Sequence, residues 1–135
     1  MEKINHECYV SLEVAKLLNK AGFDWSSFTY YDTNDVLCLS DVLITKESSD
    51  LTEYINCLVP TLEVAQRWLR EVKGILLYIT PKRVNMEWKW DFWYIDLRDK
   101  TNIEQRYSTK KFNTYEKAQE AGIKKALEII LEKGE

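Results

Sequence analysis

Glycine, histidine and long apolar runs are scarce in this chain, and each absence excludes a class of function. The 4 glycines among 135 residues are not clustered, so there is no glycine-rich loop to hold a phosphate. No apolar stretch approaches the roughly 18 residues that a membrane-spanning helix needs. The segment Met1–Glu7 lacks a basic stretch followed by an apolar one, so we expect no signal peptide and a cytoplasmic location.

Cysteine and histidine are too few and too scattered for a metal or catalytic centre. Cys8, Cys38 and Cys57 are an odd number at irregular spacing, which is typical of reduced, mostly buried thiols. His6 is the only histidine, and together with the cysteines it lacks the two close ligand pairs of a zinc site. We therefore predict a protein with no metal or cofactor that is not an enzyme.

The small net charge of −3 conceals an uneven distribution. Residues 1–58 carry 4 Lys/Arg and 10 Asp/Glu, whereas residues 59–135 carry 15 and 12. The acidic first part argues against a chain that binds nucleic acid along its whole length. The C-terminal part, with a small positive excess, leaves nucleic-acid binding open.

Apolar periodicity predicts three helices, at residues 11–21, 62–73 and 115–132. Ser11, Thr61 and Thr114 stand before them as N-cap residues, each followed two positions later by a glutamate. We interpret the shared pattern as a favourable helix-capping sequence that occurs at three separate helices, rather than as a sign of a duplicated module. Gly122 inside the last helix costs about 1 kcal/mol relative to alanine, so we expect a close approach to another element there.

The segment 87–97 is the most distinctive, because it holds three of the 5 tryptophans and is expected to form one long strand. Since side chains alternate between the faces of a strand, Trp88, Trp90, Phe92 and Tyr94 share one face and Trp93 lies on the other. A buried aromatic removes roughly 150–250 Å² from water. We therefore expect the four-aromatic face to pack on helices, the alternative being an exposed platform for a ligand or partner.

Together these elements predict an α+β protein. Residues 59–135 are expected to form a three-stranded antiparallel meander flanked by two helices, in the order α-β-β-β-α. Residues 1–58 are expected to form an acidic subdomain, a helix followed by a hairpin of 28–31 with 36–39. This subdomain should cover the second face of the sheet or extend its edge, with both parts forming one compact unit. The remaining predictions are strands at 75–80, 87–97 and 103–111, a turn at 81–85 and a polar loop at 46–50.

Two segments, 14–23 (VAKLLNKAGF) and 60–71 (PTLEVAQRWLRE), carry a resemblance to known proteins. They resemble a group of short bacterial proteins of uncharacterised activity that are often found near prophage or mobile-element genes. The resemblance covers most of the chain, including the closing segment 114–118. It implies an accessory protein rather than a metabolic enzyme.

The order of elements in residues 61–133 is also similar to that of double-stranded-RNA-binding domains. That similarity implies RNA contacts from a basic cluster before the last helix, from a loop between strands and from the first helix. The last helix departs from the pattern, because Glu116 and Glu120 stand where lysines are expected, and the loop lacks a Gly-Pro-x-His sequence. The matching positions here are Lys110, Lys111, Lys82, Arg83, Arg67, Arg70 and Lys73.

Two functions follow from these patterns. The first is a small cytoplasmic binding or adaptor protein that contacts an unknown protein partner and no membrane, with a dimer left open. Its candidate contact residues are Trp88, Trp90, Trp93, Trp25 and Tyr30. The alternative is binding of double-stranded RNA or DNA, with candidate residues Lys82, Arg83, Lys110, Lys111, Arg67 and Arg70.

Overall fold

The computed structural model describes residues 6–98, 105–107 and 111–132. Within them the helices are η1 (His6–Cys8, a 3₁₀ turn), α1 (Leu12–Lys20), α2 (Lys46–Asp50), α3 (Leu62–Val72) and α4 (Tyr115–Glu132). The strands are β1 (Ser27–Asp32), β2 (Leu37–Ile44), β3 (Ile55–Leu58), β4 (Ile75–Val84), β5 (Glu87–Asp96) and β6 (Gln105–Tyr107).

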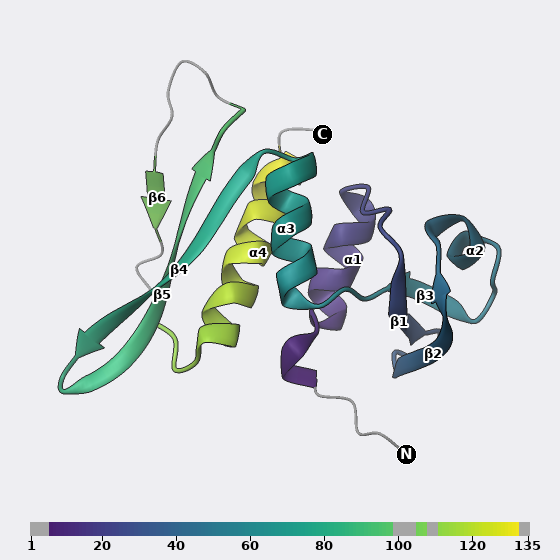
Figure 1. Ribbon diagram of the computed structural model, residues 1–135, viewed down its shortest axis with the longest axis horizontal. Helices are drawn as coiled ribbons and strands as arrows, with labels where there is room; N and C mark the ends of the chain where they lie inside the picture. The colour runs from purple at the N-terminus through teal and green to yellow at the C-terminus, as the bar shows by residue number, and fades with distance from the viewer. Residues whose placement is uncertain (1–5, 99–104, 108–110, 133–135) are drawn as a thin grey trace.

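Helices α1, α3 and α4 lie in the middle of the molecule, with an antiparallel sheet at each end (Figure 1). The strand orders are β2-β1-β3 in the N-terminal sheet and β4-β5-β6 in the C-terminal sheet. The α+β class is therefore confirmed, as is the α-β-β-β-α order of residues 62–132.

The three long helices begin with the same local contact. The hydroxyl of Ser11 accepts a hydrogen bond from the Val14 amide at 3.3 Å, and that of Thr61 accepts from the Val64 amide at 3.2 Å. Thr114 accepts from the third amide of α4 in the same way. Each such cap is worth about 1 kcal/mol, so these helix starts are fixed by local sequence, as predicted.

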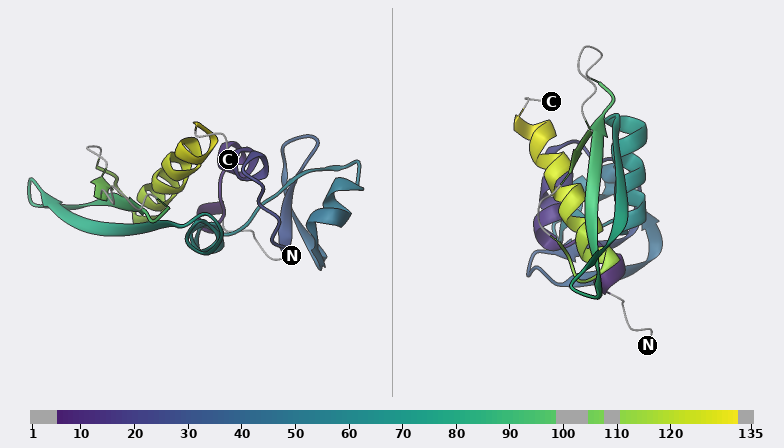
Figure 2. Two further views of the ribbon diagram at one scale, coloured as in Figure 1. Left: turned by 90° about the horizontal axis from the view of Figure 1, so that it is seen from above. Right: turned by 90° about the vertical axis from the view of Figure 1, so that its left-hand side faces the viewer.

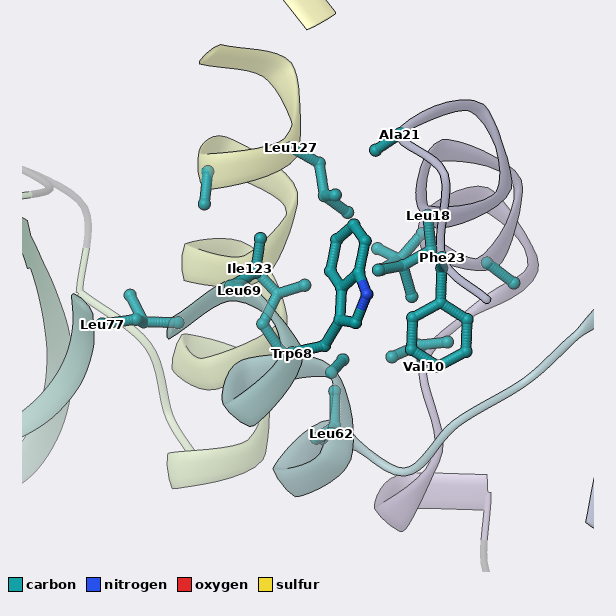
Figure 3. Close-up of a cluster of buried hydrophobic side chains, with 14 of the residues drawn as sticks. Val10, Leu18, Ala21, Phe23, Leu62, Trp68, Leu69, Leu77, Ile123 and Leu127 are labelled. Atoms are coloured by element: carbon teal, nitrogen blue, oxygen red, sulfur yellow. The ribbon is translucent and has the colours of Figure 1, made fainter. Parts of the chain in front are cut away.

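Trp68 of α3 is the centre of the hydrophobic core. Its side chain is fully buried, and its ring meets Phe23 edge-on with the ring centres 5.4 Å apart. Leu18 of α1 and Leu127 of α4 lie on either side of the indole (Figure 3). Residues from 1–58 and from 59–135 thus contribute to one continuous core.

Gly122 allows α4 to lie directly on the C-terminal sheet. A Cβ atom at this position would stand 2.6 Å from Cδ1 of Leu77 and 3.2 Å from Cγ of Phe92. Both distances are shorter than side-chain contacts normally allow, so only glycine fits without movement. The expected close approach is confirmed, and it fixes which face of β4 and β5 the helix covers.

The hairpin of β4 and β5 is longer than the sequence predicted. The strands pair in continuous register from Ile75–Asp96 to Val84–Glu87. The turn is Asn85-Met86, whose φ angles of 51° and 69° suit a two-residue hairpin turn. The predicted turn at 81–85 is therefore wrong, because β4 continues through Pro81 to Val84.

Pro81 fits inside β4 because β4 is an edge strand of its sheet. Its partner Trp90 bonds through both backbone groups to Phe112 instead, with N to O distances of 2.8 Å. In an antiparallel ladder, the backbone groups of such a pair point away from each other. The proline nitrogen therefore faces the outer edge of the sheet, where a missing N–H breaks no ladder bond.

Only the inner half of the four-aromatic face is core. Phe92 and Tyr94 are buried, and Trp90 is half-buried with its ring edge-on to Tyr115 at 5.4 Å. Trp88 is 60% exposed because the hairpin extends past α4 (Figure 1). The prediction that all four aromatics pack on helices is wrong for Trp88.

The predicted third strand is confirmed at β6, and of its described residues only Lys111 lies outside the strand. β6 pairs with β5 at Trp93–Tyr107 and Ile95–Gln105, and Phe112 forms a separate bridge to Trp90. Residues 103–104 and 108–110 of the predicted strand lie outside the described residues.

The N-terminal part does not take the expected place. β1, β2 and β3 form a sheet of their own, on the far side of the helices from β4 and β5 (Figure 2). The prediction that this part covers or extends the C-terminal sheet is therefore wrong, because Trp68, Leu18 and Phe23 join the two parts through the helices. The predicted hairpin is confirmed by the pairing of Tyr30 with Cys38.

The predicted polar loop at 46–50 is also wrong, because these residues form α2. The Thr45 hydroxyl accepts a hydrogen bond from the Ser48 amide at 3.1 Å, and the Ser48 hydroxyl accepts one from the Thr45 amide at 3.1 Å. This reciprocal capping starts a short helix in a segment without an apolar stripe.

Gly122→Ala should destabilise the protein by up to about 2 kcal/mol. Alanine gains about 1 kcal/mol of helix propensity, but overpacking against Leu77 and Phe92 costs about 1–3 kcal/mol. Urea unfolding followed by tryptophan fluorescence measures the difference. Lys125→Ala, at an exposed position of the same helix, should change little. A Gly122→Ala protein more stable than the wild type would contradict the close-packing account.

Candidate functional site

The face of the C-terminal sheet that points away from α4 is the best candidate site. Since the face with Leu77 and Phe92 meets α4 at Gly122, the alternate residues of β4 and β5 point to the other side. The left view of Figure 2 shows α4 on one side of the hairpin only. We call this second side the open face; its half-buried residues are Leu76, Tyr78, Thr80, Lys82, Val84, Lys89, Trp93 and Ile95.

Two aromatic rings form the middle of the open face. Tyr78 and Trp93 are direct partners in the ladder, and their rings lie 5° from parallel with centres 6.5 Å apart. The indole Nε1 of Trp93 donates a hydrogen bond to the Thr80 hydroxyl at 3.2 Å. The Lys82 ammonium lies 5.8 Å from the centre of the same indole ring. The rings are thus held in one geometry, with a cation at their outer end.

A buried ion pair supports the same face at the level of Thr80. The Asp91 carboxylate is fully buried, with one oxygen 2.8 Å from the Lys111 ammonium and the other accepting from the Phe92 amide at 2.8 Å. A buried carboxylate needs such a partner, because leaving it unpaired costs several kcal/mol. Lys111 therefore holds the sheet together and offers little charge to a ligand.

The tip of the hairpin presents a second aromatic group on the opposite face. The guanidinium of Arg83 lies 5.5 Å from the ring centre of Trp88, and Met86 is 81% exposed in the turn. Lys89, near the tip, is bound by Glu87 at 3.4 Å and by Asn113 at 2.6 Å. The tip therefore exposes Met86 and Trp88 together with the guanidinium of Arg83.

The structure separates the five aromatic residues predicted to bind a partner. Trp88 and Trp90 lie on the helix-facing side of β5, and Trp93 lies on the open face. Trp25 lies beside the helices, with the Arg67 guanidinium 5.6 Å from its ring centre. Tyr30 belongs to the N-terminal sheet, edge-on to Tyr54 at 6.0 Å.

The basic residues predicted to bind nucleic acid are also dispersed. Lys82 and Arg83 point to opposite faces of β4, because they are neighbours in a strand. On α3, Arg67 is paired with Glu71 at 3.2 Å, and Arg70 lies beside Glu63 and Arg67 in a shallow depression. Lys111 is bound by Asp91, and Lys110 lies outside the described residues.

Sequence reasoning missed a buried amide network that fixes α3 and α4 to β4. The Gln119 amide, 1% exposed, donates to Glu63 at 3.0 Å and to Gln66 at 2.8 Å, and the Gln66 amide donates to the Leu77 carbonyl at 2.7 Å. Burial, followed by the charges of Glu63 and Glu116, raises the pKa of Tyr115 beside it. The signal in the sequence was a glutamine inside an apolar helix stripe.

Sequence reasoning also missed Tyr78 and Leu76 as members of the open face. Their alternation with Ile75 and Leu77 was visible, but their partners on β5 depend on the register of the hairpin. The register sets Tyr78 against Trp93 and Leu76 against Ile95.

The described residues show no arrangement typical of metal or thiol chemistry. No group of three or more His, Cys, Asp or Glu side chains among them is placed to hold a metal ion. Burial raises the pKa of the Cys57 thiol, and the pKa of the Cys38 thiol is raised first by burial and then by Asp32. Neither thiol is therefore activated as a nucleophile.

In residues 6–98, 105–107 and 111–132, no helix is both long and apolar enough to cross a membrane. Comparison of the chain with protein-family models, with curated proteins and with solved structures finds no match. The arguments about function therefore depend on the geometry of these surfaces.

Lys111→Met should destabilise the protein by about 3 kcal/mol, because it leaves the buried Asp91 carboxylate without its cation. Urea unfolding monitored by tryptophan fluorescence measures the loss. The double variant Asp91→Asn/Lys111→Met should recover part of it, since no buried charge remains. Lys117→Met, at an exposed position of α4, is the matched control and should stay near the wild type. Equal stability of Lys111→Met and the control would show that the ion pair is dispensable.

Proposed function

We propose that this chain is a small non-enzymatic binding protein that acts through protein–protein contacts, with its partner docking on the open face. The observation that supports the proposal is the parallel pair of Tyr78 and Trp93 on a sheet face opposite the helices. Leu76 and Ile95 extend this pair into an apolar strip. Tyrosine and tryptophan are enriched at the energetic centres of protein interfaces.

The geometry lowers the cost of binding. Ordering a free side chain at an interface costs about 0.5–1.5 kcal/mol, but Trp93 is already held by Thr80, by Tyr78 and by the strand backbone. Burial of apolar surface returns about 25 cal/mol for each Å² removed from water. A fixed aromatic strip therefore retains more of its burial energy as affinity.

Duplex RNA or DNA is the alternative occupant, and the geometry supports it less. Phosphate binding needs several cations along one surface. Lys82 and Arg83 lie on opposite faces, and Lys111 and Lys89 are engaged by carboxylates. The similarity to double-stranded-RNA-binding domains is therefore one of element order, without the aligned basic surface.

An accessory role, as the sequence resemblance implies, agrees with this proposal. Such a protein acts by occupying a surface of another protein, and it needs no reaction centre. Of the five aromatic residues predicted from the sequence to contact a partner, this proposal keeps only Trp93, and it adds Tyr78.

Site-specific crosslinking tests the proposed contact. A photoreactive phenylalanine analogue at Tyr78 should give a protein adduct in cells of the source organism, because the open face lies against its partner. The same analogue at Lys125, an exposed position on the outer side of α4, should give none. The mass of the adduct identifies the partner.

Two outcomes would contradict the proposal. Equal adducts at positions 78 and 125, or no adduct at either, would remove the open face as the contact surface. A gel shift with duplex RNA and duplex DNA at two salt concentrations tests the alternative. Tight binding that falls steeply with salt would favour nucleic acid instead.

A further inference from the structure

The two ends of the molecule carry opposite unpaired charges. At the N-terminal sheet, residues 27–58 hold six Asp or Glu and one Lys. That lysine, Lys46, is paired with Asp50 at 3.1 Å. Among the described residues, the other five carboxylates have no lysine or arginine partner: Asp32, Asp35, Asp41, Glu47 and Glu53.

The same end is also the most apolar part of the surface. Eleven large hydrophobic residues are exposed in the described chain, and seven of them lie in or beside β1, β2, α2 and β3. We call this surface, formed by residues 27–58, the acidic end. Its exposed hydrophobic residues are Phe28, Val36, Leu39, Val42, Leu43, Leu51 and Tyr54. Such a concentration of exposed apolar side chains marks an interaction site.

The β4–β5 hairpin has the complementary character. Each of its three acids is paired: Glu87 with Lys89 at 3.4 Å, Asp91 with Lys111 at 2.8 Å, and Asp96 with Arg98 at 2.9 Å. These pairs leave two cations without a carboxylate partner in the described structure. Lys82 and Arg83 are those cations, and each lies over an indole ring.

The acidic end and the hairpin lie at opposite ends of the long axis of the molecule (Figure 1). One chain therefore cannot bring them into contact, but two chains can. We propose that the acidic end of one copy docks on the open face of the next copy, around Tyr78 and Lys82. This inference rests on the proposed function, because it names a second copy as the partner at that face.

Charge decides the arrangement of the two copies. A symmetric contact between two acidic ends would place like charges together, which is costly. A head-to-tail contact on the open face sets carboxylates of the acidic end against Lys82, and apolar residues against the strip of Tyr78 and Trp93. A standard interface buries about 800 Å² on each partner, about a tenth of the 8476 Å² surface of the chain. A head-to-tail contact leaves one end of each copy free, so it builds rings or open chains.

Mixing two variants tests the arrangement. Tyr78→Ser/Lys82→Ser disables the open face and keeps the acidic end, whereas Asp41→Ser/Val42→Ser disables the acidic end and keeps the open face. Light scattering after gel filtration should give a wild-type mass that rises with concentration at low salt and falls in high salt. Each variant alone should be monomeric, with self-affinity weakened at least about tenfold. Their equimolar mixture should form a dimer and grow no further.

The outcomes separate this inference from the proposed function. Recovery of a dimer in the mixture also shows that both variants are folded. A wild type that stays monomeric at every concentration, or variants that fail to complement although circular dichroism shows them folded, would overturn head-to-tail docking. A crosslink from position 78 to a different protein would also overturn it while supporting the proposed function. The absence of any crosslinked adduct at position 78 would contradict both head-to-tail docking and the proposed function.

Discussion

The burial of Trp68 between α1 and α4 is the constraint on which the rest of the structure depends. Removing an indole from water is worth about 5 kcal/mol, from roughly 200 Å² at 25 cal/mol per Å². Its Nε1 has no hydrogen-bond acceptor in the described structure, and such an omission costs about 1–3 kcal/mol. Burial of the indole outweighs that cost, so α3 is held against Leu18 and Phe23 of the N-terminal part.

This central packing determines what each sheet can offer. The helices lie between the two sheets, so α4 meets the C-terminal sheet on one face and α1 lies toward the N-terminal sheet. Gly122 brings α4 close to Leu77 and Phe92 and thereby leaves Tyr78 and Trp93 pointing away from the helices. The candidate site is thus a consequence of helix packing on the other side of the same strands.

Part of the candidate site could be predicted from the sequence, and the reasons why the rest could not be are physical. Alternation along β5 correctly predicted that Trp93 and Trp90 point to different faces of the sheet, because side-chain direction is a local property of a strand. Tyr78 was not found, because its pairing with Trp93 depends on the register between two strands. The extension of β4 through Pro81 was missed, since proline breaks a strand unless its nitrogen lies at an edge, and edge position is a property of the whole sheet.

The helix starts at Ser11, Thr61 and Thr114, the α+β class and the close approach at Gly122 were determined by the sequence alone. Each depends on neighbouring residues, on capping, periodicity or the lack of a Cβ. Only the tertiary structure decided that the N-terminal part lies beyond the helices and that Asp91 holds Lys111. It also decided that Lys82 and Arg83 have no carboxylate partner among the described residues. These facts depend on contacts between residues far apart in the chain, which local patterns do not encode.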